Sequence, residues 1–189
     1  IWDKTQTIIS KTDLVGTIEY INDVFTDVSG YEDSEIVCKP HNTIRHPDMP
    51  KAIFKLMWEN IKVGNQFHGI IKNLAKSGRY YWAITNFEYT KDAKGNITNY
   101  VAKRKAVPQE IVTKHIEPLY KKVLSIEKAS GDVAGEKYLI GYLEDMGVSY
   151  VDYVTNLMMD HEKASIPATE SEEVKKEKKT GFFSNFFGN

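Results

Sequence analysis

Residues 66–105 read QFHGIIKNLAKSGRYYWAITNFEYTKDAKGNITNYVAKRK. Turn signals at 76–78 (Lys-Ser-Gly) and 92–96 (Asp-Ala-Lys-Gly-Asn) divide this stretch into runs rich in aromatic and β-branched residues. Runs of this kind, joined by short connections that contain glycine, are typical of antiparallel hairpins. The sequence therefore predicts three consecutive strands, over residues 66–75, 79–89 and 97–105.

The residues that precede this stretch predict two further strands and several helices. Residues 7–10 and 17–21 are strand candidates on either side of a turn. Asn22 stands where a helix N-cap is expected, and Gly30 ends the short helix that follows. Residues 51–63 predict a longer helix, because apolar residues recur at helical spacing along one side. That apolar stripe consists of Ile53, Phe54, Met57, Trp58 and Ile61.

This order of elements indicates an α+β fold, in which a five-stranded antiparallel sheet carries helices on one face. We expect residues 5–107 to form this domain. The sheet and the helices together enclose a cup, which either fills with its own side chains or holds a flat ligand.

Residues 108–161 predict a helical appendage. Apolar residues from Val112 to Ile126 recur in steps of four and three, as in a coiled-coil seam, and a second seam runs from Leu139 to Leu157. Glycines at 131 and 135 separate the seams, and Pro118 implies a kink or the start of a new helix. The pattern predicts a helical hairpin whose seams face each other, and we expect them also to support a homodimer.

Residues 162–189 predict a flexible tail. Its segment 170–179 is highly charged but neutral overall, which is typical of a disordered or weakly helical chain. Four phenylalanines follow, at 182, 183, 186 and 187. Such an arm suits a peptide that docks on a partner groove or makes peripheral contact with a membrane surface. The alternative is a tail without a role.

The composition of the whole chain narrows the class of protein. The 189 residues carry 25 basic and 26 acidic side chains, well mixed, which argues against a nucleic-acid partner. The single cysteine, Cys38, favours a reducing compartment. No apolar run approaches the ~18–20 residues that span a bilayer, and no signal peptide is visible. We expect a cytoplasmic protein. Because the chain begins at Ile1 rather than Met, we also expect a native N-terminal segment to precede it.

Several short motifs carry a resemblance to a known family. The most specific is PHNTIRHPDMPK at residues 40–51. Other motifs lie at 10–14, 22–23, 28–31, 57–58, 69–73, 76–78, 81–82 and 116–121. On these motifs the chain resembles, over residues 10–124, the flavin-binding PAS domain of bacterial aerotaxis receptors and related energy-taxis proteins.

The resemblance implies a redox sensor that binds FAD non-covalently. The family's flavin-binding positions fall on Asn22, Arg45, His46, Asp48, Phe54 and Asn73, and Trp58 falls at a matching family tryptophan in the pocket region. A further aromatic position is Phe67 in this chain, where the family has tryptophan. The family's receptors carry a transmembrane segment and a signalling domain, which this chain lacks. The resemblance therefore implies a separate partner, a membrane-bound chemoreceptor or chemotaxis signalling complex, which would hold the protein at the inner membrane.

The residues alone support part of this site. Phe54 and Trp58 lie four positions apart and so share one face of their helix. Asn73 alternates onto the same side of its strand as Phe67 and Gly69, and Gly69 leaves room for a close-lying ring. We expect Asn73, or Asn22 opposite it, to be the contact that reads the redox state.

The charged residues of the 40–51 loop allow two readings. Arg45 and His46 suit ribose or phosphate oxygens, whereas Asp48 repels phosphate and is expected to cap the following helix or to hold His46. Each candidate also has a structural alternative: core packing for the aromatics, solvent exposure for Asn73, loop capping for His46 and Asp48, and a surface ion pair for Arg45.

Other chemistry finds little support in the sequence. No metal-ligand spacing and no catalytic constellation is visible, so we predict no enzymatic activity. In an alignment with light-oxygen-voltage domains, His41 stands at the position of their reactive cysteine, and Cys38 falls three residues early. We therefore expect Cys38 to be a buried or loop residue. The alternatives to a flavin sensor are a ligand-free docking module and a PAS sensor for another ligand, such as haem.

Overall fold

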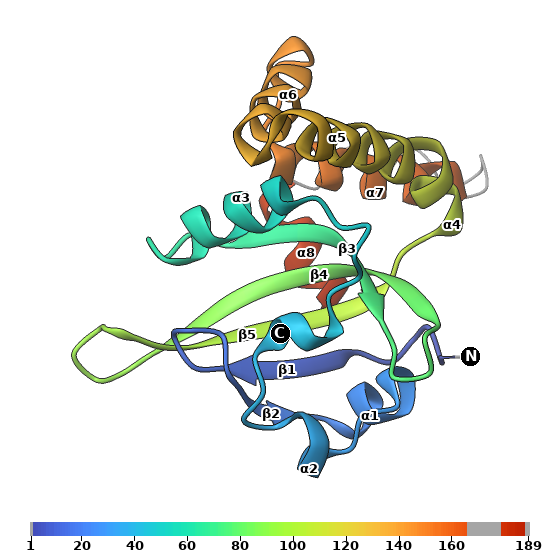
Figure 1. The fold of residues 1–189 in the computed structure, drawn as a ribbon. Coiled ribbons are helices and arrows are strands. Elements are labelled where there is room, and N and C mark those ends of the chain that lie inside the picture. Colours follow the sequence, from blue (N-terminus) through green and yellow to red (C-terminus); the bar gives the residue numbers. More distant parts are fainter. Residues whose placement is uncertain (1, 166–178, 188–189) are drawn as a thin grey trace.

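The computed structural model describes residues 2–165 and 179–187. Within them, five antiparallel strands form one sheet, as the sequence predicted, and the structure gives their order as β2-β1-β5-β4-β3 (Figure 1). Strand β5 pairs with both β1 and β4, so the last strand of the domain lies at the centre of the sheet. The strands are β1 (Ile8–Thr12), β2 (Ile18–Ile21), β3 (Phe67–Leu74), β4 (Tyr80–Lys91) and β5 (Ile97–Ala106).

The helices between β2 and β3 cover one face of the sheet, which we call the inner face (Figure 1). Asn22 caps the first of them, because its side chain accepts a hydrogen bond from the amide of Phe25, and Gly30 ends it with φ = 73°. Both predictions are confirmed. The helices are α1 (Asp23–Ser29), α2 (Asp33–Ile36), the 3₁₀ helix η1 (His41–Ile44) and α3 (Lys51–Ile61).

The N-terminus of α3 is capped from a distant part of the chain. Pro50 occupies the N-cap position and offers no side-chain acceptor. The carboxylate of Glu127 instead accepts hydrogen bonds from the amides of Lys51 and Ala52, at 3.0 and 2.9 Å. The expectation that Asp48 caps this helix is therefore wrong.

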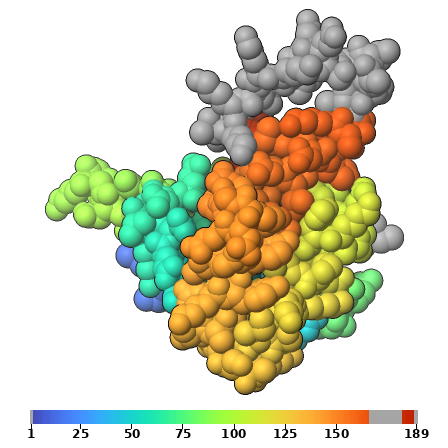
Figure 2. Space-filling model, turned by 90° about the horizontal axis from the view of Figure 1, so that it is seen from above, coloured from blue at the N-terminus to red at the C-terminus, as the bar shows by residue number. Residues whose placement is uncertain are grey.

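The C-terminal helices form three long elements rather than one hairpin. Pro118 lies in the first turn of α5, where its missing N–H is tolerated, so the helix starts there. Helices α5 and α6 form the predicted hairpin across Gly131, but a turn at Gly147 divides the second seam between α6 and α7. Figure 2 shows the three helices side by side, with α3 against α6. The elements are α4 (Gln109–Ile111), a π-helical turn (Val112–Ile116), α5 (Glu117–Ser130), α6 (Asp132–Asp145) and α7 (Tyr150–Ser165).

Two tyrosines attach these helices to the edge strand of the sheet. The hydroxyl of Tyr120 on α5 donates to the carbonyl oxygen of Ile70 at 2.8 Å. The hydroxyl of Tyr150 on α7 lies 3.4 Å from the amide nitrogen of Ile70 and also hydrogen-bonds Tyr120. The open edge of β3 is thus closed by side chains, which protects it from pairing with another strand.

The aromatic end of the chain folds back on the sheet. Helix α8 (Lys179–Phe187) lies behind the sheet in Figure 1, on the face opposite η1 and α3, which we call the outer face. Phe182, Phe183 and Phe187 are buried, so the expectation of a disordered tail is wrong for this helix. Residues 166–178, which include most of the charged segment, lie outside the described residues. No helix in the described ranges is both long and apolar enough to cross a membrane.

Candidate functional site: a cavity between the sheet and helix α3

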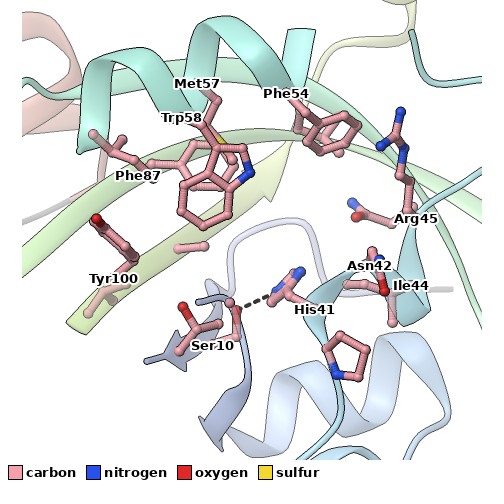
Figure 3. Close-up of a pocket in the computed structure, with 18 of the residues that line it drawn as sticks. Ser10, His41, Asn42, Ile44, Arg45, Phe54, Met57, Trp58, Phe87 and Tyr100 are labelled. Carbon is pink, nitrogen blue, oxygen red and sulfur yellow. Dashed lines mark hydrogen bonds between the residues drawn. The ribbon is translucent and has the colours of Figure 1, made fainter. Parts of the chain in front are cut away.

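A cavity of about 290 Å³ lies between the inner face of the sheet, α3 and the η1 loop (Figure 3). The cup is therefore not filled by its own side chains. It is lined by residues of β1, η1, α3, β3, β4 and β5. The lining residues that matter below are Ser10, His41, Arg45, Phe54, Trp58, Asn73, Tyr100 and Arg104.

Helix α3 supplies an aromatic wall. Phe54 and Trp58, four residues apart, both line the cavity, as their spacing predicted, and Figure 3 shows them reaching down from α3. The ring of Trp58 packs edge-on against Tyr100 of β5, with 5.5 Å between the centroids. Such a wall suits the face of a planar ligand.

Asn73 brings an amide into this apolar setting. Asn73 is only 3 % exposed, and its side-chain nitrogen has no hydrogen-bond partner among the described residues. The alternative that Asn73 is solvent-exposed is therefore wrong. A buried donor without a partner costs roughly 1–3 kcal/mol, and a ligand that offers an acceptor would remove that cost.

Arg45 lies beside this wall. Its guanidinium stacks over the ring of Phe54, 4.2 Å from the centroid, and donates to the carbonyl oxygen of Met49 at 3.1 Å. Partial burial lowers the pKa of Arg45 from its ordinary value. Arg45 forms no ion pair among the described residues, contrary to the salt-bridge alternative, so its remaining donors are free for a ligand.

A cationic group that the sequence analysis missed lies on the side of the cavity opposite α3. Arg104 of β5 is 1 % exposed and donates to the hydroxyl of Ser10 at 3.0 Å and to Nε2 of His41 at 2.8 Å. Nε2 of His41 also lies 2.9 Å from the hydroxyl of Ser10 (Figure 3). The signal was present in the alternation of β5, because Tyr100, Ala102 and Arg104 share the inner face.

Of Arg104 and His41, it is Arg104 that carries the positive charge, as the pKa values show. Burial, together with the positive charge of Arg104, lowers the pKa of His41 to about 3. Burial lowers the pKa of Arg104 to about 10. At neutral pH Arg104 is therefore charged and His41 is neutral, with its ring proton on Nδ1 because Nε2 accepts from the guanidinium.

Four of the sequence-predicted site residues do not line the cavity. They are Asn22, His46, Asp48 and Phe67. The side chain of Asn22 is fully used by the backbone: its oxygen accepts from the amides of Ile9 and Phe25, and its nitrogen donates to the carbonyl of Thr7. The structure therefore does not place Asn22 opposite Asn73.

His46 and Asp48 hold the loop instead. Nδ1 of His46 accepts from the amide of Asp48 at 3.1 Å, and the carboxylate of Asp48 lies 2.7 Å from the ammonium of Lys72. The hydrogen bond from Lys72 lowers the pKa of Asp48. The structural alternative, in which these residues stabilise the loop, describes the geometry found.

Phe67 and Gly69 face helix α7 rather than the cavity. The ring of Phe67 stacks on Tyr150 with 5.6 Å between centroids and an interplanar angle of 11°. A methyl group added at Gly69 would lie 3.1 Å from the ring of Phe67 and in ordinary contact, at 3.7 Å, with that of Tyr150. Gly69 thus makes room for the ring of Phe67, and because it does not line the cavity, the expectation that it makes room for a ligand ring is wrong.

Neither Cys38 nor a cluster of potential metal ligands lies at this cavity within the described residues. Cys38 is exposed, in a loop with φ = 64°, and does not line the cavity, whereas His41 does. No group of three or more potential metal ligands occurs among the described residues.

Comparison with known proteins identifies the domain. Residues 18–102 match the family model described as PAS fold, so the chain contains a PAS domain. Over 116 residues it is 44% identical to the aerotaxis receptor of Escherichia coli (strain K12), a match that covers 61% of this chain and 22% of the receptor. The resemblance seen in the sequence is thereby confirmed over the PAS region, which is similar to that of the receptor.

Two further comparisons extend this result. Over 168 residues the chain is 24% identical to the bacterioopsin transcriptional activator of Halobacterium salinarum, covering 89% of this chain and 22% of that protein. Among solved structures, a light-oxygen-voltage domain studied with a flavin analogue superposes with a TM-score of 0.55 at 18% identity. That match covers 62% of this chain and 89% of the domain, and it establishes a shared fold. The chain spans about a fifth of the length of these two curated relatives.

Proposed function

We propose that this protein is a redox sensor that holds FAD non-covalently in the cavity under α3 and reports its redox state to a partner chemoreceptor. The observation that carries the proposal is the unpartnered amide of Asn73, buried beside the Phe54 and Trp58 wall of an open cavity. The 44% identity to an aerotaxis receptor supports the same function.

The cavity fits the ring system of a flavin. Its volume of about 290 Å³ lies at the lower end of ligand cavities, which run from roughly 300 to 1,000 Å³. That volume suits the ring system, and the diphosphate and adenosine of FAD would extend beyond it. Phe54 and Trp58 would contact the ring, Asn73 would hydrogen-bond its polar atoms, and Arg45 would approach the phosphates. A bound flavin would supply reversible electron transfer at this site.

The contacts of α3 offer a route for output. Phe54 and Trp58 belong to the helix whose N-terminus Glu127 of α5 caps, and β3, which carries Asn73, is bonded to Tyr120 and Tyr150. A shift of either wall would therefore act directly on α5 and α7. Such small rigid-body shifts are sufficient to bias a two-state partner. We assign the partner role to a membrane-bound chemoreceptor or chemotaxis complex, with this protein on the cytoplasmic side and no catalytic activity of its own.

An absorption spectrum of the purified protein, oxidised and then reduced, tests the proposal. We expect the oxidised bands of flavin, their bleaching by dithionite, and release of FAD on heat denaturation. Material that is colourless and takes up no added FAD would contradict the proposal and favour a ligand-free docking module. A haem spectrum would contradict it in favour of a different sensor.

A further inference from the structure

We propose that Arg104, held by Ser10 and His41, is an anion-accepting floor of the cavity that receives the electron-rich edge of the flavin ring and favours its reduced, negatively charged form. This inference rests on the proposed function, because the ligand it describes is a flavin. None of these three residues is among the flavin-binding positions that the family resemblance indicated.

The first observation is a buried charge that the protein does not compensate. Arg104 is 1 % exposed and forms no ion pair among the described residues. Its acceptors are all neutral: the hydroxyl of Ser10, Nε2 of His41 and the carbonyl oxygen of Ala102. Its Nε has no hydrogen-bond partner among the described residues. Burying an unpaired cation is costly, so such a group normally faces an anion.

The second observation is that, in the part of the chain that the structure describes, no group that interacts with Arg104 becomes an anion in the neutral pH range. Tyr81 is the titratable group that interacts electrostatically with Arg104, and burial raises the pKa of its phenol to about 12. His41 offers a lone pair but no negative charge. The cavity floor therefore keeps its positive charge unless a ligand compensates it.

The third observation is the position of Arg104 relative to the other ligand-directed groups. Arg104, Asn73 and Trp58 line the same cavity, and we expect one flat ring to contact all three. Arg45, which is less buried, also lines the cavity and is available for phosphate. We therefore assign Arg104 to the ring rather than to the diphosphate.

The chemistry of flavin reduction makes this assignment consequential. A flavin ring that takes up two electrons and one proton carries one negative charge, whereas the oxidised ring is neutral. A buried cation beside the ring stabilises the reduced form selectively. Arg104 thus raises the midpoint potential as well as the affinity for flavin.

Arg104→Gln and Arg104→Lys, measured in the full-length flavin-loaded protein, test the assignment. We expect Arg104→Gln to lower the equilibrium constant for reduction at least tenfold, which is about 30 mV for a two-electron couple. Arg104→Lys, which keeps the charge, should recover most of that loss. An unchanged potential in Arg104→Gln with flavin bound would overturn the inference while leaving the proposed function intact.

A second pair of variants does not depend on removing Arg104. Ser10→Asp places a carboxylate where Arg104 now donates at 3.0 Å, and Ser10→Asn is its neutral match. We expect Ser10→Asp to lower the potential as Arg104→Gln does, and Ser10→Asn to leave it nearer the wild-type value. Equal potentials in the two Ser10 variants would count against the inference.

The affinities for riboflavin, FMN and FAD show whether Arg104 contacts the flavin ring or a phosphate group. If Arg104 meets the ring, Arg104→Gln should weaken all three by a similar factor. Weakening of FMN and FAD alone would overturn the inference and place Arg104 on a phosphate. Wild-type protein that takes up none of the three would refute the proposed function itself.

Discussion

At the scale of single residues, the two asparagines that the sequence nominated for the same role have opposite environments. Asn22 satisfies every polar atom of its side chain with backbone groups of β1 and α1. Asn73 is buried beside the aromatic wall with its amide nitrogen unpaired. Hydrogen bonds that are already made stabilise the fold, whereas a donor left unpaired is available to a ligand.

We therefore expect Asn22→Ala and Asn73→Ala to separate stability from binding. Asn22→Ala should lower the free energy of unfolding by roughly 1 kcal/mol or more, because it removes a helix cap and the hydrogen bonds to the backbone of Thr7 and Ile9. Asn73→Ala should leave the stability of the flavin-free protein unchanged or raised. It should weaken flavin binding by roughly 1–3 kcal/mol, or about 5–150-fold.

Urea unfolding without flavin and a fluorescence titration with FAD measure the two effects. A large loss of stability in Asn73→Ala would show that this amide supports the fold and not the ligand. Weaker FAD binding by folded Asn22→Ala would show that Asn22 reaches the cofactor after all.

At the scale of elements, one carboxylate joins the PAS domain to the C-terminal helices. Glu127 is buried and accepts from two amides at the N-terminus of α3, where negative charge also favours the helix dipole. Gly135 of α6 leaves space for the side chain of Glu127, because a methyl group at that position would lie 2.3 Å from it. The glycine that the sequence suggested as a break between helices thus lies inside α6, where it permits close packing.

We expect Glu127→Ala and Gly135→Ala to have the same effect. Each should destabilise the protein by roughly 1–2 kcal/mol, since each disturbs the cap on α3. Their effects should not add in the double variant, because both act through one contact. Hydrogen exchange at the amides of residues 51 and 52 and urea unfolding measure this.

Lys55→Ala provides the matched control. It removes an ion pair with Glu136 that joins α3 to α6 but leaves the cap intact. This exposed lysine should contribute little to stability. Fully additive losses in the Glu127 and Gly135 double variant would mean that the two residues act independently.

At the scale of the whole molecule, the C-terminal helices bury the apolar seams against the rest of the chain, and α8 packs on the outer face of the sheet. Leu119, Val123 and Leu139 of the predicted seams are buried within the chain, so a homodimer must use other residues. The outer face of the sheet is covered by α8, whose Phe183 stacks on His68 with 4.0 Å between centroids. Light scattering on the full chain tests the dimer, which stays a prediction.

Removal of residues 179–189 should expose His68. Burial lowers the pKa of His68 to about 4 in the intact chain, so docking of α8 favours the neutral ring. The stability that this contact contributes is complete above the ordinary histidine pKa of about 6.5 and is lost as pH falls towards 4. The truncated chain should show a raised pKa of His68 and a smaller loss of stability between these pH values.

Proton NMR titration of the histidines measures this pKa, and His68→Gln in the full chain assigns the signal. An unchanged pKa after truncation would mean that α8 does not cover His68 in solution.

The sequence alone determined the order and type of the elements between residues 7 and 105, the α1 cap at Asn22 and the shared cavity face of Phe54 and Trp58, because each depends on spacing within a few residues. Only the tertiary structure decided which polar groups line the cavity. Arg104 meets Ser10 and His41 across 94 and 63 residues, and Glu127 caps α3 across 75 and 76. Contacts of this range follow from strand register and helix packing, which no local pattern encodes.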